Sequence, residues 1–326
     1  MRFLVIGAGS IGTRHCRNLV SLGHSVLAWD ADPGRRAAVA GVPGVTVPGS
    51  LEDALAAKPD AALICTPPAS HPAPARRALA AGLHLFIEKP IASAVADALP
   101  LIEEAERRGR LLAVGFNLRF LPSLRRVKEM LDDRRVGRVL AARAEFGSYL
   151  PGWRPGRDYR DNYAVRAAEG GGILLDAIHE LDYLGWLFGA VTDVLCTAEH
   201  VSDLHGDTED LAEVTLRFAS GALAQAHLDY LQRAYRRNLQ VIGDAGSIAW
   251  DYPTHAVTVV APDRSPEVIS VNDGAANDMY LEELRHFVRC LEGRESPLVD
   301  GRDALRSLGL VEAAKASARD GHRVKL

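Results

Sequence analysis

The first residues whose types and spacing could do chemistry are three glycines near the start of the chain. Gly7, Gly9 and Gly12 follow an apolar segment and open a helical one in the pattern G-x-G-x-x-G. In this pattern the first glycine allows a tight turn, the second lets the backbone approach a pyrophosphate, and the third lets helix and strand pack closely. Free N–H groups at the start of the helix favour the diphosphate. The sequence therefore predicts a dinucleotide site here.

A carboxylate at the end of the next apolar segment indicates which dinucleotide is bound. Asp30 lies 18 residues after Gly12. Its side chain can accept hydrogen bonds from a ribose diol and would repel a 2′-phosphate, so we expect NAD rather than NADP. Arg35 and Arg36 follow closely, and either would reverse this preference if it reached the ribose.

A lysine stands where an expected strand ends. Glu88-Lys89-Pro90 follows the apolar segment 83–87, and lysine is scarce in this chain. The carboxyl edge of an open parallel sheet is where ligands bind. An ammonium group shielded from water there could polarise a substrate hydroxyl or take part in proton transfer. The alternative is an exposed lysine at the start of a loop.

A histidine follows the glycine cluster at 170–172 on an expected helix over 172–188. At about 100° per residue, one face of this helix is apolar and the opposite face carries Asp176, His179, Tyr183 and Trp186. The histidine can accept a proton near neutral pH, and Asp176 can hold its tautomer. We therefore interpret this face as a pocket wall, with a buried or interfacial histidine as the alternative.

The elements that must position these groups follow two patterns. In the first third, short apolar segments alternate with helical ones, which predicts a doubly wound parallel α/β sheet with strands at 2–6, 25–29, 61–66, 83–87 and 111–116. After about residue 120, consecutive strands with short glycine-bearing turns predict an α+β domain with an open antiparallel sheet. We expect a dinucleotide-binding domain over 1–120 and a substrate-binding and oligomerisation domain over 121–326.

Length, charge and cysteine content exclude several classes of protein. A chain of 326 residues predicts two domains, and a net charge of −4 gives no case for nucleic acid or an anionic membrane as partner. The four cysteines are far apart, and no run of about 18 apolar residues occurs, so we expect a cytoplasmic protein. The acidic and histidine residues at 199–207 lack ligand spacing, and we expect no metal.

Taken together, these motifs resemble the glucose–fructose oxidoreductase / inositol dehydrogenase / MocA (Gfo/Idh/MocA) family. The resemblance rests on GAGSIG at 7–12, CTPPASH at 65–71, AGLHLFIEKP at 81–90 and the glycine–histidine helix at 170–182. It implies a Rossmann domain, NAD(P)-dependent oxidation or reduction of sugars, cyclitols or related polyols, and a C-terminal sheet that serves homodimer or homotetramer contacts.

The resemblance also implies roles for particular residues. Lys89 corresponds to the family lysine that contacts the substrate hydroxyl, and the peptide before Pro90 is often cis in the family. His179 corresponds to the acid/base histidine and Asp176 to the carboxylate before it. Many members place that carboxylate four residues before the histidine and here it is three before, so Asp182 is a rival partner.

From these correspondences we expect two sets of contacts. The cofactor set comprises Gly7, Gly9, Ser10, Ile11, Gly12, Asp30, Thr66, Pro67, Pro68, His71, Glu88 and Lys89. The substrate set comprises Lys89, Asn117, Arg119, Trp153, Arg154, Tyr159, Tyr163, Asp176 and His179.

The segment 148–169 is expected to influence the choice of substrate. Aromatic residues and arginines alternate in it, and its proline and glycine residues predict a loop that leads into the His179 helix. One interpretation is a substrate lid whose arginines bind a carboxylate or phosphate. The other is a subunit contact, because interfaces are also rich in Tyr, Trp and Arg.

The leading hypothesis is an NAD-dependent oxidoreductase that transfers hydride between nicotinamide and a secondary alcohol or ketone of a sugar, cyclitol or sugar derivative. Lys89 and His179 would act on the same oxygen atom. Two alternatives remain open. One is an enzyme that holds and recycles NAD, as in epimerisation or oxidation-assisted elimination, and the other is a non-catalytic NAD-sensing protein.

Overall fold

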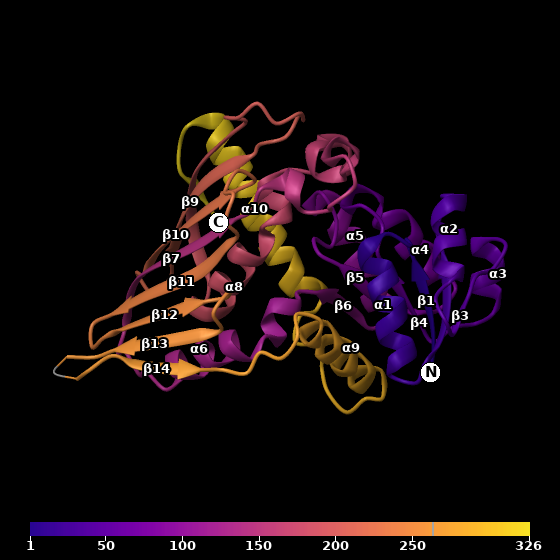
Figure 1. Ribbon diagram of the computed structural model, residues 1–326, viewed down its shortest axis with the longest axis horizontal. Helices are drawn as coiled ribbons and strands as arrows, with labels where there is room; N and C mark the ends of the chain where they lie inside the picture. The colour runs from indigo at the N-terminus through magenta and orange to yellow at the C-terminus, as the bar shows by residue number, and fades with distance from the viewer. Residues whose placement is uncertain (263) are drawn as a thin grey trace. The chain divides into compact units, whose positions relative to one another are not determined.

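Short apolar segments of the first third pair into a parallel sheet in the computed structural model, which describes residues 1–262 and 264–326 (Figure 1). The strand order is β3-β2-β1-β4-β5-β6. The bounds are β1 Arg2–Ile6, β2 Ser25–Trp29, β3 Val45–Thr46, β4 Ala61–Ile64, β5 His84–Glu88 and β6 Leu112–Gly115. The order reverses between β1 and β4, so the crevice where ligands bind in such sheets lies between these two strands.

Helices cover this sheet because its central strands are buried on both faces. They are α1 Ser10–Ser21, α2 Pro33–Ala40, α3 Leu51–Ala56, α4 Pro72–Ala80 and α5 Val95–Arg107. A further helix, α9 Asp278–Leu291, packs against α1. The ring of Phe287 on α9 lies 6.4 Å from that of Phe3 and 5.5 Å from that of Phe86.

The chain divides into two compact units whose membership differs from the expected domains. The first unit holds residues 1–117 and 277–308, and the second holds 118–276 and 309–326. The first change of unit is close to the expected residue 120, but α9 and the start of α10, Gly301–Asp320, belong with the first unit. The pattern of α9 predicts an apolar face, and periodicity alone does not say which sheet that face covers.

The second unit is built on a nine-stranded sheet of order β14-β13-β12-β11-β7-β10-β9-β8-β15. Its strands are β7 Val139–Gly147, β8 Val191–Glu199, β9 Leu211–Phe218, β10 Leu223–Asp229, β11 Arg236–Gly243, β12 Ser247–Asp251, β13 Ala256–Val260, β14 Glu267–Ser270 and β15 Val324–Lys325. Neighbouring strands are antiparallel except β10 and β7, which are parallel. The expected antiparallel sheet is thus a mixed one, because a long connection through helices lets β7 insert beside β10 instead of beside the strand that follows it.

Helices cover one face of the mixed sheet, and within residues 1–262 and 264–326 the opposite face is open (Figure 1). On the covered face lie α6 Pro122–Asp132, α7 Ile173–Asp176 and α8 Ile178–Phe188. The helix expected over 172–188 is therefore broken at Ala177, whose φ of −92° and ψ of 25° are not helical. Within the described residues, none of the helices combines the length and apolar character needed to cross a membrane.

Candidate active site

The glycine turn after β1 has the shape that the sequence motif requires. Gly7 has φ of +99°, and a Cβ atom there would lie 2.6 Å from the backbone of Cys65. A Cβ on Gly12 would lie 1.8 Å from the carbonyl oxygen of Gly7, so this position packs α1 against the turn. A Cβ on Gly9 would meet no atom within 4 Å. The turn is thus closed at Gly7 and Gly12 and open at Gly9, where a pyrophosphate needs close access to the backbone.

Asp30 follows β2 and is held beside this turn. Its Oδ2 accepts a hydrogen bond of 2.7 Å from the Ala8 N–H, and its Oδ1 accepts one of 2.8 Å from the Asp32 N–H. The Arg35 guanidinium lies 3.8 Å from Oδ2 and is largely exposed, whereas Arg36 donates to the backbone carbonyl of Asp30 at 2.7 Å. The carboxylate is therefore oriented by backbone groups, and Arg35 is the arginine that remains close to its oxygens.

The loops after β4 and β5 are joined through His71. This side chain is 1% exposed and lies 2.7 Å from the Thr66 carbonyl oxygen through Nε2 and 2.9 Å from the Pro90 carbonyl oxygen through Nδ1. Burial lowers the pKa of His71. The two carbonyl contacts act to raise this pKa, but the effect of burial is larger. The Lys89–Pro90 peptide is cis. His71 thus links the segment Thr66-Pro67-Pro68 to the Lys89 turn at one edge of the sheet.

The strand that ends before Lys89 carries a buried contact between a carboxyl group and an imidazole that the sequence analysis missed. Glu88 Oε1 lies 2.6 Å from His15 Nε2, and His15 is fully buried. Asn117, expected to contact substrate, is buried at the start of the turn that follows β6. The parallel order of the strands therefore brings the segments at Gly7, Asp30, Thr66, Lys89 and Asn117 to the same carboxyl edge.

The glycine cluster in the second unit allows close packing before α7. A Cβ on Gly171 would lie 2.4 Å from the Tyr163 carbonyl oxygen, and one on Gly172 would lie 2.4 Å from Glu209 Oε1. Gly172 also has φ of +108°, which side chains with a Cβ rarely adopt. Glycine at these positions lets the 148–169 segment and the 199–209 connector pack directly against the start of α7.

Asp176 is held by two tyrosines. Tyr163 donates a hydrogen bond of 2.5 Å to Oδ1, and Tyr230 donates one of 2.6 Å to Oδ2. Burial, followed by the negative charge of Asp176, raises the pKa of Tyr230 well above 10, so its phenol stays a donor at neutral pH. The indole of Trp153 packs edge to face on Tyr230 with ring centroids 5.4 Å apart. The 148–169 segment therefore contacts Asp176 directly through Tyr163 and packs on its other phenol donor, Tyr230, through Trp153.

His179 lies in the first turn of α8 and is 9% exposed. The next residue, Glu180, is fully buried and accepts a hydrogen bond of 2.8 Å from Arg237 of β11. The Arg237 guanidinium also lies 4.5 Å from the centre of the Phe146 ring. This buried pair fixes the helical turn that carries His179 against the sheet.

Asp182 forms a second buried ion pair on α8. Its two oxygens each accept a hydrogen bond of 2.8 Å from Arg119, and the guanidinium lies 5.7 Å from the Trp186 ring centre. Asp182, the rival partner for His179, is thus the bidentate partner of Arg119. Tyr183, expected on a pocket wall, is fully buried against Trp250 with ring centroids 6.1 Å apart, so that expectation is wrong. The break at Ala177 separates Asp176 from α8 but leaves His179 and Tyr183, four residues apart, on one face of that helix, so it is the packing on Trp250 that takes Tyr183 into the core.

The remaining residues of the 148–169 segment lie in different surroundings. Tyr159 accepts a hydrogen bond of 2.9 Å from the His205 N–H and so joins the segment to the 199–209 connector. Arg154 and Arg157 are exposed, whereas Arg160 pairs with Asp158. In the described parts of the chain, no group of three or more His, Cys, Asp or Glu side chains could hold a metal ion.

Two residues of these clusters could have been found in the sequence. Tyr230 continues the alternation of buried residues along β10, after Ala226 and Leu228, so its phenol had to find a buried partner. His15 follows the glycine turn on the buried face of α1. The acids that pair with these two side chains are distant in the sequence, and no local pattern reveals them.

Known proteins match the chain over its whole length. The family described as "Oxidoreductase family, NAD-binding Rossmann fold" matches residues 1–116, and the GFO/IDH/MocA C-terminal domain matches residues 124–249. The myo-inositol 2-dehydrogenase of Thermotoga maritima is 31% identical over 342 residues, which cover 100% of this chain and 98% of that protein. The scyllo-inositol 2-dehydrogenase (NAD(+)) of Bacillus subtilis is 29% identical over 100% of this chain and 96% of its own.

Solved structures give the same result. The WlbA dehydrogenase of Bordetella pertussis, in complex with NADH and UDP-GlcNAcA, superposes with a TM-score of 0.85 at 26% identity and covers 100% of this chain and 98% of that one. The residues at the glycine turn and at Asp30 fit the nucleotide that this fold binds, because the turn is open only at Gly9 and the carboxylate is oriented beside it. The chain belongs to the Gfo/Idh/MocA family of oxidoreductases, and its N-terminal part is an NAD-binding Rossmann fold.

Proposed function

We propose that the protein is an NAD-dependent dehydrogenase or reductase that acts on a secondary alcohol or ketone of a sugar, cyclitol or sugar derivative. The observation that carries this proposal is the carboxyl edge of the parallel sheet, where the open glycine turn, Asp30 and Lys89 follow neighbouring strands. The relatives named above act on cyclitols or are bound to a nucleotide sugar, which supports the substrate class.

The chain's own residues account for cofactor binding. The diphosphate would lie on the N–H groups at the start of α1, beside Gly9. The Asp30 carboxylate would accept hydrogen bonds from the adenosine ribose diol, and the same charge would repel a 2′-phosphate. Thr66, Pro67 and Pro68, held through His71, would border the nicotinamide. NAD is therefore the preferred nucleotide, with Arg35 as the residue that moderates the preference.

The nicotinamide, when bound, supplies hydride transfer. Lys89 donates a hydrogen bond to the reacting oxygen of the substrate and stabilises the negative charge that develops there. His179 accepts the hydroxyl proton during oxidation and returns it during reduction. Tyr163 and Tyr230 orient the two oxygens of Asp176. Asp176 therefore presents a carboxylate of fixed geometry on the substrate-binding surface.

The 148–169 segment supports a role in substrate choice. Tyr163 bonds to Asp176 and Trp153 packs on Tyr230 within one chain, as expected for a lid that provides ring surfaces to a sugar. The exposed arginines Arg154 and Arg157 favour a substrate with a carboxylate or phosphate. The proposal therefore includes anionic sugars and nucleotide sugars among the substrates to be tested.

The open face of the nine-stranded sheet is proposed as the contact between copies of the chain. Leu223, Ala141 and Ile242 are paired neighbours across β10, β7 and β11 and form an apolar row on this face. Leu223 and Ile242 are each 39% exposed. Contiguous apolar surface of this kind is typical of protein interfaces.

The mass of the protein in solution, measured by light scattering after gel filtration, tests this contact. We expect Ile242→Glu to lower this mass. Val201→Glu, at an exposed position in the connector after β8, should leave it unchanged. Equal masses for all three proteins would remove this proposal.

A substrate screen tests the proposed reaction. The purified protein is incubated with NAD or NADP and with cyclitols, aldoses, uronates, sugar phosphates and nucleotide sugars, at neutral and alkaline pH. We expect reduced nicotinamide to form with at least one of them, and faster with NAD. Product without net reduction of the nucleotide would instead support internally recycled NAD. NAD binding without conversion of any compound would contradict the proposed activity.

A further inference from the structure

Helix α9 carries a carboxyl group that the proposed reaction does not use. Glu283 is 2% exposed, and both of its oxygens are buried without a hydrogen-bond partner among the described residues. A buried carboxylate without a partner is costly. An uncharged side chain would cost far less at this position. Glu283 is therefore an exception in an otherwise apolar helix face that needs an explanation.

Its neighbours along α9 place Glu283 over the end of β5. Tyr280, one turn earlier, contacts the His15 ring at a centroid distance of 6.2 Å. Phe287, one turn later, contacts the Phe86 ring at 5.5 Å. Residues three and four apart on a helix share a face, so Glu283 lies on the face that covers His15 and β5.

Glu88 is the ionisable group of β5 nearest this face. Its carboxyl group lies over Gly115 of β6, where an added Cβ would come within 3.3 Å of the Glu88 Cδ. Its Oε1 lies 2.6 Å from His15 Nε2. The second nitrogen of the imidazole, Nδ1, is buried without a hydrogen-bond partner among the described residues. Two carboxyl groups and one imidazole therefore occupy one apolar region of the first unit.

We propose that Glu283 and Glu88 carry one negative charge between them, with Glu88 as the carboxylate paired to His15 and Glu283 as the neutral acid, and that this unit positions Lys89. Two carboxylates in one buried region do not both ionise, because each raises the cost of the other's charge. A neutral Glu283 leaves the Glu88–His15 pair intact, and that pair fixes the end of the strand from which Lys89 extends. The role given to Lys89 rests on the proposed function, whereas the shared charge does not.

The electrostatic surroundings agree with this assignment. Burial, followed by the charge of Glu88, raises the pKa of Glu283 well above its usual 4.5. Among the described residues, the titratable and charged groups around the pair include His15 of α1, Cys65 after β4 and His71. They also include Tyr280 of α9, with the Arg14 guanidinium 4.5 Å from its ring centre. Burial and the nearby Glu88 charge both raise the pKa of the Cys65 thiol, so it stays neutral. Arg285 and Arg289 of the same helix pair with Glu282 on its solvent-facing side.

The first test measures the proton held by Glu283 and needs neither substrate nor nucleotide. Because the pKa of Glu283 is higher in the folded chain than in the unfolded chain, its contribution to stability is full below pH 4.5 and is lost as the pH rises toward the folded value. Glu283→Gln removes this loss. We expect the urea midpoint of Glu283→Gln to rise relative to that of the native protein between pH 5 and pH 8. Glu282→Gln changes a surface carboxylate of the same helix, and its midpoint should keep a constant difference from that of the native protein over this range. Parallel curves for Glu283→Gln would overturn the shared charge.

The second test follows Lys89 itself. The chain has five lysines, so reductive ¹³C-methylation gives few NMR signals, and Lys89→Arg identifies the one from Lys89. His15→Phe keeps the ring contacts of His15 and removes its hydrogen bond to Glu88. We expect this change to move the Lys89 signal. His24→Phe, at another ring that packs edge to face on Phe3, should leave the signal in place. An unchanged Lys89 signal in His15→Phe would overturn the positioning role, and neither test depends on the outcome of the substrate screen.

Discussion

The phenol of Tyr230, the buried residue that follows β10, donates a hydrogen bond of 2.6 Å to Asp176. Tyr163 donates a second bond of 2.5 Å to the other oxygen of the same carboxylate. Asp176 is thus oriented from two directions, by the sheet and by the 148–169 segment. This carboxylate precedes His179 by three residues, on the far side of the break at Ala177.

Removing one phenol should affect both stability and turnover. A hydrogen bond to a charged group contributes about 1.5–3 kcal/mol, so Tyr230→Phe should lower the free energy of unfolding by about that amount. We also expect kcat to fall about tenfold or more, because Asp176 loses its orientation. NADH affinity, measured by fluorescence, should stay within about twofold. Tyr252→Phe, at a residue whose ring packs on Trp250, serves as the control, and equal kcat values for both variants would refute the role of Tyr230.

Replacing Asp30 should weaken NAD binding and relax the preference against NADP. Asp30→Ser removes the charge that accepts from the ribose diol, which corresponds to a loss of about 10–100-fold in NAD affinity. The Arg35 guanidinium, 3.8 Å from the carboxylate, then becomes available to a 2′-phosphate. Isothermal titration with both nucleotides checks this. Asp32→Asn, which can keep the cap on α2, should change neither affinity, and an unchanged NAD affinity in Asp30→Ser would contradict the assigned site.

The pair of Asp182 and Arg119 is buried, so removing the charge of one partner should lower the free energy of unfolding strongly. Replacing both partners by apolar residues should lower it only weakly. Asp182→Asn leaves the Arg119 guanidinium buried without its charged partner and should cost about 3–5 kcal/mol of stability. The double variant Asp182→Leu with Arg119→Met should lose much less, because both buried charges are removed. Urea unfolding of the two proteins gives the comparison. A double variant as unstable as Asp182→Asn would show that the pair contributes more than mutual neutralisation.

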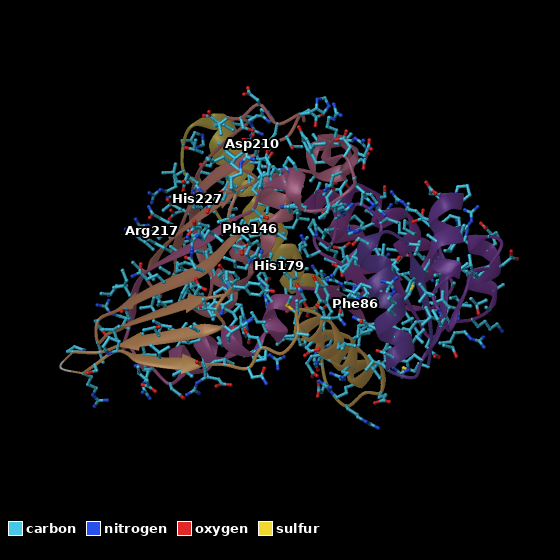
Figure 2. All side chains as sticks on the ribbon, in the orientation of Figure 1. Phe86, Phe146, His179, Asp210, Arg217 and His227 are labelled. Atoms are coloured by element: carbon cyan, nitrogen blue, oxygen red, sulfur yellow. The ribbon has the colours of Figure 1, made fainter. Side chains whose placement is uncertain are left out.

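The open face of the sheet carries a group whose ionisation should appear in the pH dependence of stability. Arg217 and His227 extend from this face, and Phe146 from the opposite one (Figure 2). Hydrogen bonds to Asp229, first, and to Glu213 raise the pKa of His227 from 6.5 to about 9. The protonated His227 imidazole stabilises the folded chain through these carboxylates. This contribution to the free energy of unfolding is complete below pH 6.5 and is lost as the pH rises through about 9.

His227→Gln should therefore flatten the fall of the unfolding free energy between pH 6.5 and 9. Glu213→Gln removes one of the two acceptors at the imidazole. It should move the fall to lower pH without abolishing it. Urea unfolding at half-unit steps of pH measures both effects. A native-like slope in His227→Gln would exclude His227 as its source.

Local patterns were sufficient to predict most of the parallel sheet of the first unit. The glycine turn, the strands of 2–6 and 25–29 and the position of Lys89 after β5 agree with the structure, because each depends on residues close in the sequence. The short strands β3 and β15, of two residues each, and the edge strand β14 were not predicted. Strands this short carry too little apolar pattern to be recognised.

Pairings between distant residues could not be predicted. The parallel pairing of β10 with β7, the His15–Glu88 pair and the two tyrosines on Asp176 each join residues that no local pattern connects. The break at Ala177 divides the helix expected over 172–188 and separates Asp176 from His179. Tyr183 lies within the unbroken helix α8, and the ring that buries it, Trp250, is distant in the sequence. The polar face of the expected helix and the resemblance to the family both indicated His179 and Asp176, and the structure supplied the partners of Asp176.

The central proposal is that Lys89 and His179 act on the same oxygen atom of an alcohol or ketone. The most direct measurement compares steady-state turnover and NADH affinity in the native protein, Lys89→Met and His179→Ala, with the best substrate from the screen. We predict that kcat falls by about a hundredfold or more in each variant, while NADH affinity changes little. Near-native kcat in either variant would contradict the proposed mechanism.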